Sequence, residues 1–171
     1  MKSIIDLVKE QRLLVPRVAE LCSTLTKLVA DTEEFRQQHP ELEKGEEEWA
    51  EDLHMQLTEL VAWAEDLHLQ LTEIAASVDS VRRERQELED ELANNRCDRQ
   101  EPGNKQPEVM LDIRVQRKDL AVRSKKLRNL QADLADQLDD ISLEQSEIAA
   151  WAEDHRVQLA RLMEQGEGAP Q

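Results

Sequence analysis

Two pairs of residues in this 171-residue chain have the spacing of metal ligands. Glu51 and His54, and again Glu65 and His68, stand three positions apart. On a helix this spacing puts both side chains on one face, as in the Glu-x-x-His motif of carboxylate-bridged di-metal bundles. That chemistry needs the motifs on different helices, whereas these two share one expected helix and lie about 21 Å apart along it. We therefore interpret them as solvated helix positions and expect neither a metal nor a cofactor.

The cysteines do not stand in a catalytic pattern. Cys22 and Cys97 lie in different segments, without a CxxC motif or the spacing of a disulfide framework, so we interpret them as reduced thiols of a cytoplasmic protein. Cys22 falls on an apolar stripe and is expected in the core, whereas Cys97 falls in an expected loop. Gly-rich phosphate loops, GxSxG and HExxH are absent from the sequence. The sequence therefore predicts that the protein is not an enzyme.

The composition is that of long helices. Leu, Ala, Glu, Gln, Asp and Arg dominate, whereas the chain has three Trp, one Phe and no Tyr. A compact enzyme of this size would bury more aromatic area. The apolar residues make up 39% of the chain and are regularly spaced, which argues against disorder. A membrane span would need about 20 consecutive apolar residues, and the sequence has no such stretch.

The net charge of −16 bears on the choice of partner. Nonspecific nucleic-acid binding requires Lys and Arg to replace phosphate counterions, and adhesion to anionic lipid also requires positively charged side chains. The negative net charge of the chain argues against both. The N-terminal stripe could in principle lie on a membrane, but its polar face mixes both signs of charge. We therefore expect protein partners, and neither nucleic acid, nor a membrane, nor a small-molecule substrate.

Helix-breaking residues divide the chain into helical segments. We expect an N-terminal amphipathic helix over 1–38, a linker at 39–45, a long heptad helix over 46–93, a loop at 94–107, a second long heptad helix over 108–164 and a disordered tail at 165–171. The first helix repeats apolar residues every seven positions, at Leu7, Leu14, Leu21, Leu28 and Phe35. Pro16 falls on the opposite face and predicts one kinked helix rather than two.

The segment 46–93 has the most regular pattern, because its seam positions alternate by four and three residues. They are Leu53, Leu57, Leu60, Ala64, Leu67, Leu71, Ile74, Val78, Val81, Arg85, Leu88 and Leu92. A period of 3.5 residues held over this length predicts a left-handed supercoil with a partner helix. The helix would be about 70 Å long, too long for a compact globule of this mass.

The segment 108–164 carries a less regular seam. Its apolar positions are Leu120, Leu127, Leu130, Leu134, Leu138, Ile141, Ile148, Ala152, Leu159 and Leu162. Leu130, Leu134 and Leu138 are spaced by four and four, a stutter that predicts local unwinding of the supercoil. Polar Gln145 and His155 fall on the same seam.

These patterns predict an all-α fold: an elongated coiled-coil helical bundle, in which a long antiparallel hairpin is braced by the kinked N-terminal helix. A short loop between long helices favours folding back, which would put Trp49 level with Trp151. The alternative is a parallel dimer of extended chains, which the Pro102-Gly103-Asn104 turn signal disfavours. Three helices with Trp near one end resemble a spectrin-type repeat, but the two long segments far exceed that unit, so nothing is carried over from it.

An internal repeat supplies candidate contact residues. WAEDLHMQLTELVA (49–62) is followed at once by WAEDLHLQLTEIAA (63–76), and a weaker copy begins at Trp151. Trp49, Trp63 and Trp151 stand beside the seam, while Met55 and Leu69 add an apolar row on the outer face. These residues are either anchors for a partner or for self-association, or part of internal three-helix packing, which is the commoner use of large helical side chains.

Charge is unevenly distributed along the chain. Residues 41–52 are strongly acidic, whereas a basic patch occupies 114–128. The patch consists of Arg114, Arg117, Lys118, Arg123, Lys125, Lys126 and Arg128. These side chains either pair with neighbouring acids or stay solvated, or they form a dock for an acidic protein or for head-to-tail assembly.

The function we expect is that of a non-enzymatic coiled-coil scaffold or adaptor. It would act through helix–helix self-association, as a homodimer or higher homo-oligomer, and through protein–protein binding. The alternative is a helical chaperone or regulator that sequesters a partner helix in an apolar groove, since excess apolar surface serves either role.

Overall fold

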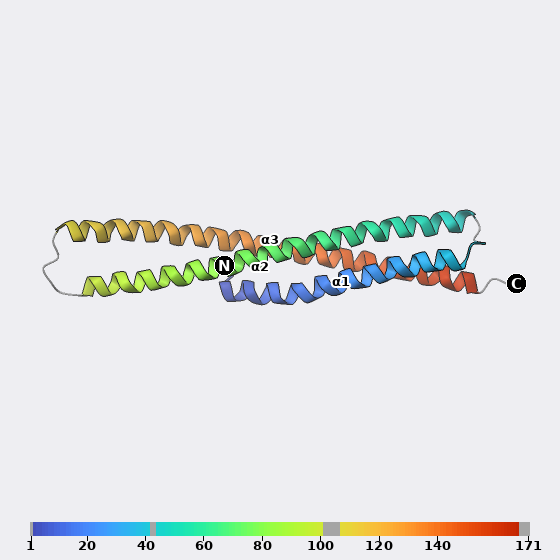
Figure 1. The fold of residues 1–171 in the computed structure, drawn as a ribbon, viewed down its shortest axis with the longest axis horizontal. Coiled ribbons are helices and arrows are strands. Elements are labelled where there is room, and N and C mark those ends of the chain that lie inside the picture. Colours follow the sequence, from blue (N-terminus) through green and yellow to red (C-terminus); the bar gives the residue numbers. More distant parts are fainter. Residues whose placement is uncertain (1, 42–43, 101–106, 168–171) are drawn as a thin grey trace. The chain divides into compact units, whose positions relative to one another are not determined.

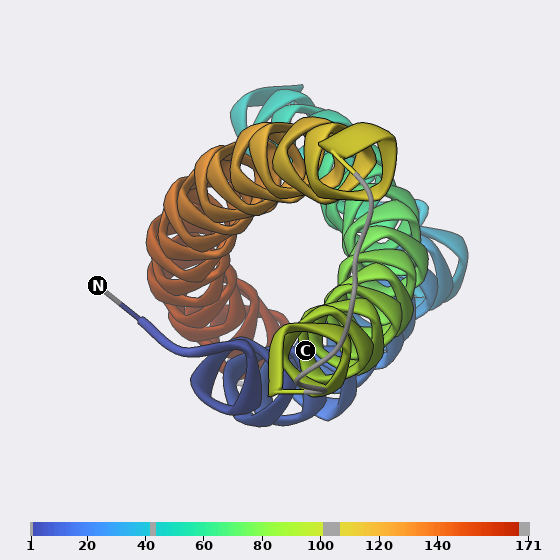
Figure 2. The same cartoon turned by 90° about the vertical axis from the view of Figure 1, so that its left-hand side faces the viewer.

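The computed structural model describes the backbone of residues 2–41, 44–100 and 107–167. These ranges contain three helices, α1 (Ile4–Gln38), α2 (Lys44–Gln100) and α3 (Pro107–Glu167), and no strand (Figure 1). The view turned by 90° shows the same helices (Figure 2). The predicted all-α fold class is thereby confirmed for the part of the chain that the structure describes.

Helix α1 begins with a capping box and ends before a proline. The Asp6 backbone N–H donates to Ser3 Oγ and the Ser3 N–H donates to Asp6 Oδ2, each over 3.2 Å. These bonds, from the Ser3 side chain first and its backbone second, lower the pKa of the Asp6 carboxyl. At the other end the His39 N–H donates to the Phe35 carbonyl over 3.1 Å, and Pro40 follows, which cannot extend the helix.

Pro16 lies inside α1, and the helix continues past it as expected. A proline leaves the carbonyl four residues earlier without its helical donor. Here that residue is Arg12, and both Arg12 and Pro16 are exposed, so water can satisfy the carbonyl. The cost of the proline is therefore smaller than it would be on the buried face.

The second and third helices are longer than the sequence pattern indicates. Helix α2 extends beyond residue 93 to Gln100, and Asn95, seven residues after Leu88, is buried at the same heptad position although its Nδ2 has no hydrogen-bond partner. Helix α3 starts at Pro107, a residue suited to the first helical position, where no N–H is needed. Parts of the expected linker (42–43), loop (101–106) and tail (168–171) lie outside the described residues, and 165–167 are helical.

The helices form two compact units. Unit 1 comprises residues 1–10 and 73–138, and unit 2 comprises residues 11–72 and 139–171. In unit 1, Arg85 of α2 contacts Gln131 of α3, and the later Glu91 contacts the earlier Arg123. The contacts of unit 2 follow the same order, from Gln56 with His155 to Trp63 with Trp151. Within each unit α2 and α3 therefore pack with opposite chain directions.

The buried side of α1 in unit 2 follows the predicted heptads with one polar addition. Its buried residues are Leu14, Val18, Leu21, Leu25, Leu28, Thr32 and Phe35. Thr32 occupies a seam position that the apolar pattern alone could not identify. Its hydroxyl donates to the Leu28 carbonyl over 2.7 Å, so the buried polar group is satisfied within its own helix.

Candidate functional site

Apart from Leu92 on α2 and Leu130 on α3, the apolar seam residues identified from the sequence in these two helices are buried. They include Leu53, Leu57, Leu60, Leu67, Leu71, Ile74, Leu127, Leu134, Leu138, Ile141 and Ile148. On α2 the alternation continues through Val78, Val81 and Leu88, with Arg85 and Leu92 as the two exposed positions. The buried seam positions therefore hold the helices together.

The stutter expected in α3 is wrong. Leu130 is 39% exposed, whereas Gln131 is only 7% exposed, so the seam passes through residues 127, 131, 134 and 138. The alternation of four and three is thus unbroken, at the cost of burying a polar side chain. The sequence pattern assigned Leu130 to the seam because it considered apolar residues alone. A glutamine that is buried through its hydrogen bonds cannot be recognised from hydrophobic spacing.

Gln131 is tolerated because it completes a polar layer in unit 1. Its Nε2 donates to the Lys2 backbone carbonyl, and its Oε1 accepts from Arg85 Nη1 over 3.4 Å. Arg85 also lies 3.6 Å from Glu89 on its own helix. Arg85, the charged residue on the α2 seam, therefore contacts Gln131, a polar residue on the α3 seam. Gln131 in turn contacts Lys2, which lies just before α1. Such a layer favours one register, because a shifted pairing would leave these groups unpaired.

The Trp residues are not equivalent. Trp63 and Trp151 meet edge to face, with ring centroids 6.5 Å apart and planes at 83°. Trp63 and Trp49 are half-buried, whereas Trp151 is 55% exposed. The expected match of Trp49 with Trp151 is therefore wrong. Both copies of the repeat contact α3, but it is the Trp of the second copy, Trp63, and not that of the first, that meets Trp151.

Small and polar seam residues surround this aromatic pair in unit 2. Ala64 and Ala152, each directly after a Trp, are buried. The His155 Nδ1–H donates to the Trp151 carbonyl over 2.6 Å, and its Nε2 lies 2.6 Å from Gln56 Oε1. His155 is buried, as its place on the seam implied. Its ring is held from both sides, so it joins α3 to α2 rather than offering a free base.

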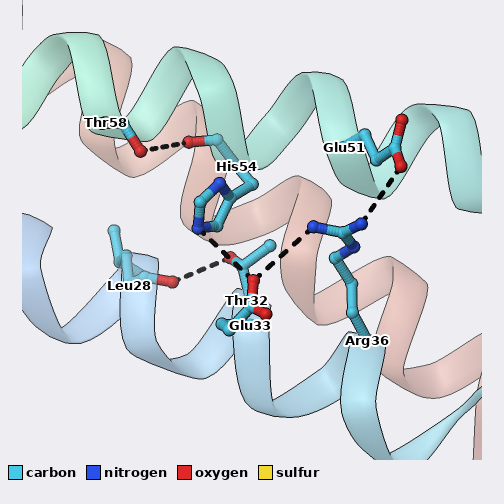
Figure 3. Close-up of polar contacts among 7 residues, drawn as sticks. All are labelled: Leu28, Thr32, Glu33, Arg36, Glu51, His54 and Thr58. Carbon is cyan, nitrogen blue, oxygen red and sulfur yellow. Dashed lines mark hydrogen bonds and ion pairs between the residues drawn. The ribbon is translucent and has the colours of Figure 1, made fainter.

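Glu51 and His54, the first of the two pairs with metal-ligand spacing, contact charged side chains of α1 (Figure 3). Arg36 Nη2 donates to Glu51 Oε1 over 3.1 Å, and Glu33 lies 3.5 Å from His54 Nε2 and from Arg36 Nη1. Among the described residues there is no group of three side chains that could hold a metal ion. The first Glu-x-x-His copy thus serves to connect α1 with α2 in unit 2.

Cys22 is a half-buried free thiol on α1. Burial is the main cause that raises its pKa, and the nearby carboxylate of Glu65 adds to the effect. A raised pKa leaves less thiolate at neutral pH, which suits a packing residue better than a nucleophile. The expected loop position of Cys97 belongs to helix α2, and its side chain lies outside the described part of the structure.

The outer-face residues of α2 are exposed, as an interaction surface requires. Met55 is 60% exposed and Leu69 is 63% exposed. Large apolar side chains at both positions of a repeated motif leave apolar area in contact with water. The carboxylates that lie between them in the sequence, on the same side of α2, are exposed as well.

The basic patch on α3 in unit 1 is divided between paired and solvated side chains. Its exposed members are Arg114, Lys118, Lys125, Lys126 and Arg128, whereas Arg117 and Arg123 are half-buried. Arg123 pairs with Glu91 over 2.7 Å, and this bond raises the pKa of its guanidinium. Arg117 Nε is buried without a hydrogen-bond partner. Arg123 therefore acts within the unit, and the exposed lysines remain available to a partner.

Comparisons with protein-family models, with curated proteins and with solved structures find no significant match to this chain. The likeness to a spectrin-type repeat therefore gains no support from them. In the described part of the chain, no helix contains an apolar stretch long enough to cross a membrane.

Proposed function

We propose that this protein is a non-enzymatic coiled-coil scaffold or adaptor that works through self-association and protein–protein contact. Its architecture would be an elongated antiparallel hairpin of α2 and α3, braced by α1 with a kink at Pro16. The cytoplasm is the proposed location, since the two cysteines lack the spacing of a disulfide framework. In this view the buried seam supplies stability and the outer faces supply the contacts.

The observation that carries the proposal is the apolar surface left over once the seam is filled. Met55 and Leu69 on α2, and Val115 and Val122 on α3, are all exposed and lie outside the heptad seam. Single exposed apolar residues are ordinary, but residues repeated at helical spacing on one side of a helix form a contact surface. Trp151, exposed next to buried Ala152, extends the apolar surface in unit 2.

Light scattering after gel filtration, at several protein concentrations, tests the self-association. We expect a mass above that of one chain which rises with concentration. The variant Met55→Ser with Leu69→Ser should lower that mass while leaving the helical circular dichroism unchanged, because neither side chain is part of the seam. A single-chain mass at every concentration would refute self-association.

A groove in unit 1 favours a second candidate function, a chaperone or regulator that binds a partner helix. Side chains of α2 and α3 line it, and they are Arg85, Leu88, Glu89, Leu92, Ser124, Leu127, Arg128 and Gln131. Leu92 is partly exposed there, so a third helix could cover it. The variant Leu92→Glu should abolish binding of an amphipathic helical peptide under this view, and leave self-association unaffected. Unchanged peptide binding by Leu92→Glu would argue against the second function.

A further inference from the structure

A second stripe runs along α2 in unit 2, outside the seam. We call it the acidic stripe, and it consists of Asp52, Met55, Glu59, Ala62, Asp66 and Leu69. The spacing alternates by three and four residues, so the six side chains share one side of the helix. All six are exposed. Carboxylates and apolar groups therefore alternate along a face that the bundle leaves open.

A matching stripe of opposite charge runs along α3 in unit 1. We call it the basic stripe, and it consists of Leu111, Val115, Lys118, Val122 and Lys125. Its spacing alternates by four and three residues, and all five side chains are exposed. From Val115 onward, apolar groups and lysines thus alternate here with the same average period as the carboxylates and apolar groups of α2.

Among the residues that the structure describes, the charges of both stripes form no salt bridge. None of the salt bridges among the described residues uses Asp52, Glu59 or Asp66, and none uses Lys118 or Lys125. Asp66 accepts a hydrogen bond only from Gln70 of its own helix. By contrast, Arg123 and Arg156, which lie outside the stripes, have carboxylate partners at 2.7 and 2.6 Å.

We propose that the acidic stripe of one copy packs against the basic stripe of a second copy. This inference rests on the proposed function, and it names the partner and the surfaces of the self-association. Three features select a second copy: opposite charge, a common period of 3.5 residues, and similar length. By helical rise the stripes span about 26 and 21 Å. The interface joins different surfaces of two copies, so it is heterologous and sensitive to salt.

Charge exchange between two variants tests the pairing. The basic-stripe variant carries Lys118→Glu and Lys125→Glu, and the acidic-stripe variant carries Asp52→Lys and Asp66→Lys. Each alone presents two stripes of the same sign, so its self-association, measured by sedimentation velocity, should weaken roughly tenfold or more. An equimolar mixture restores opposite signs at both kinds of contact and should associate again. A mixture that stays dissociated would overturn the proposal.

A matched pair of apolar substitutions distinguishes this contact from nonspecific hydrophobic association. Val122 and Leu143 both lie on the outer face of α3 and are 67% and 66% exposed, but only Val122 belongs to the basic stripe. Val122→Ser should weaken self-association about fivefold, since it removes roughly 1 kcal/mol of apolar contact, and Leu143→Ser should leave it unchanged.

If the wild type associates and both charge variants associate equally well, the stripe pairing fails while the scaffold function stands. If the wild type is monomeric, both fail.

Discussion

Leu67 and Leu69 of α2 are the same residue type two positions apart, yet they differ in what surrounds them. Leu67 is completely buried on the seam, and Leu69 is 63% exposed on the outer face. Both lie in unit 2 and in the middle of the same helix, so helix propensity and distance from the helix ends are matched. Replacing each with Ala therefore measures burial alone.

The expected losses of stability differ several-fold. Leu67→Ala deletes three buried carbons, worth about 2.4 kcal/mol at ~0.8 kcal/mol per group, and the remaining cavity brings the loss to about 3 kcal/mol. Only about a third of Leu69 is covered, so Leu69→Ala removes roughly 0.8 kcal/mol of apolar burial. The better helix propensity of Ala offsets about 0.2 kcal/mol in each variant. Thus Leu67→Ala should lower the free energy of unfolding about five times as much as Leu69→Ala.

Urea unfolding followed by circular dichroism at 222 nm measures this difference. The protein should be dilute, so that self-association does not contribute, and the slope of free energy against urea should match between variants. At high protein concentration the loss for Leu69→Ala should grow, because association then adds to stability. Equal losses for the two variants in dilute protein would refute the assignment of Leu67 to the seam and Leu69 to the outer face.

Three further predictions concern polar and thiol groups. Gln131→Ala should destabilise the protein by about 1–2 kcal/mol, because the Lys2 carbonyl loses its donor, and hydrogen exchange at the start of α1 should accelerate. His155→Ala should cost about 2 kcal/mol in thermal unfolding, as it removes a buried ring with both nitrogens in contact. In a Cys97→Ser background, iodoacetamide should modify Cys22 more slowly than free cysteine at pH 8, since its raised pKa leaves less thiolate.

Much of the helical pattern could be predicted from residue spacing. A period of 3.5 residues in α2, interrupted only by Arg85, identified the buried leucines from Leu53 to Leu88 and failed only at Leu92, because a helix presents such positions along one side whatever its partner. The same reasoning placed Pro16 on the exposed side of α1. It failed at Thr32 and Gln131, because their burial depends on hydrogen bonds that a hydrophobic pattern does not contain.

Pairing between helices was decided by the tertiary structure. The 14-residue repeat makes Trp49 and Trp63 equivalent in sequence, and only the register between α2 and α3 selects Trp63 as the neighbour of Trp151. Likewise, the spacing of Glu51 and His54 is compatible with a metal site until α1 supplies Arg36 and Glu33 as their partners. Periodicity along one chain determines which face a residue occupies, whereas register depends on where the chain reverses and on which polar groups then meet.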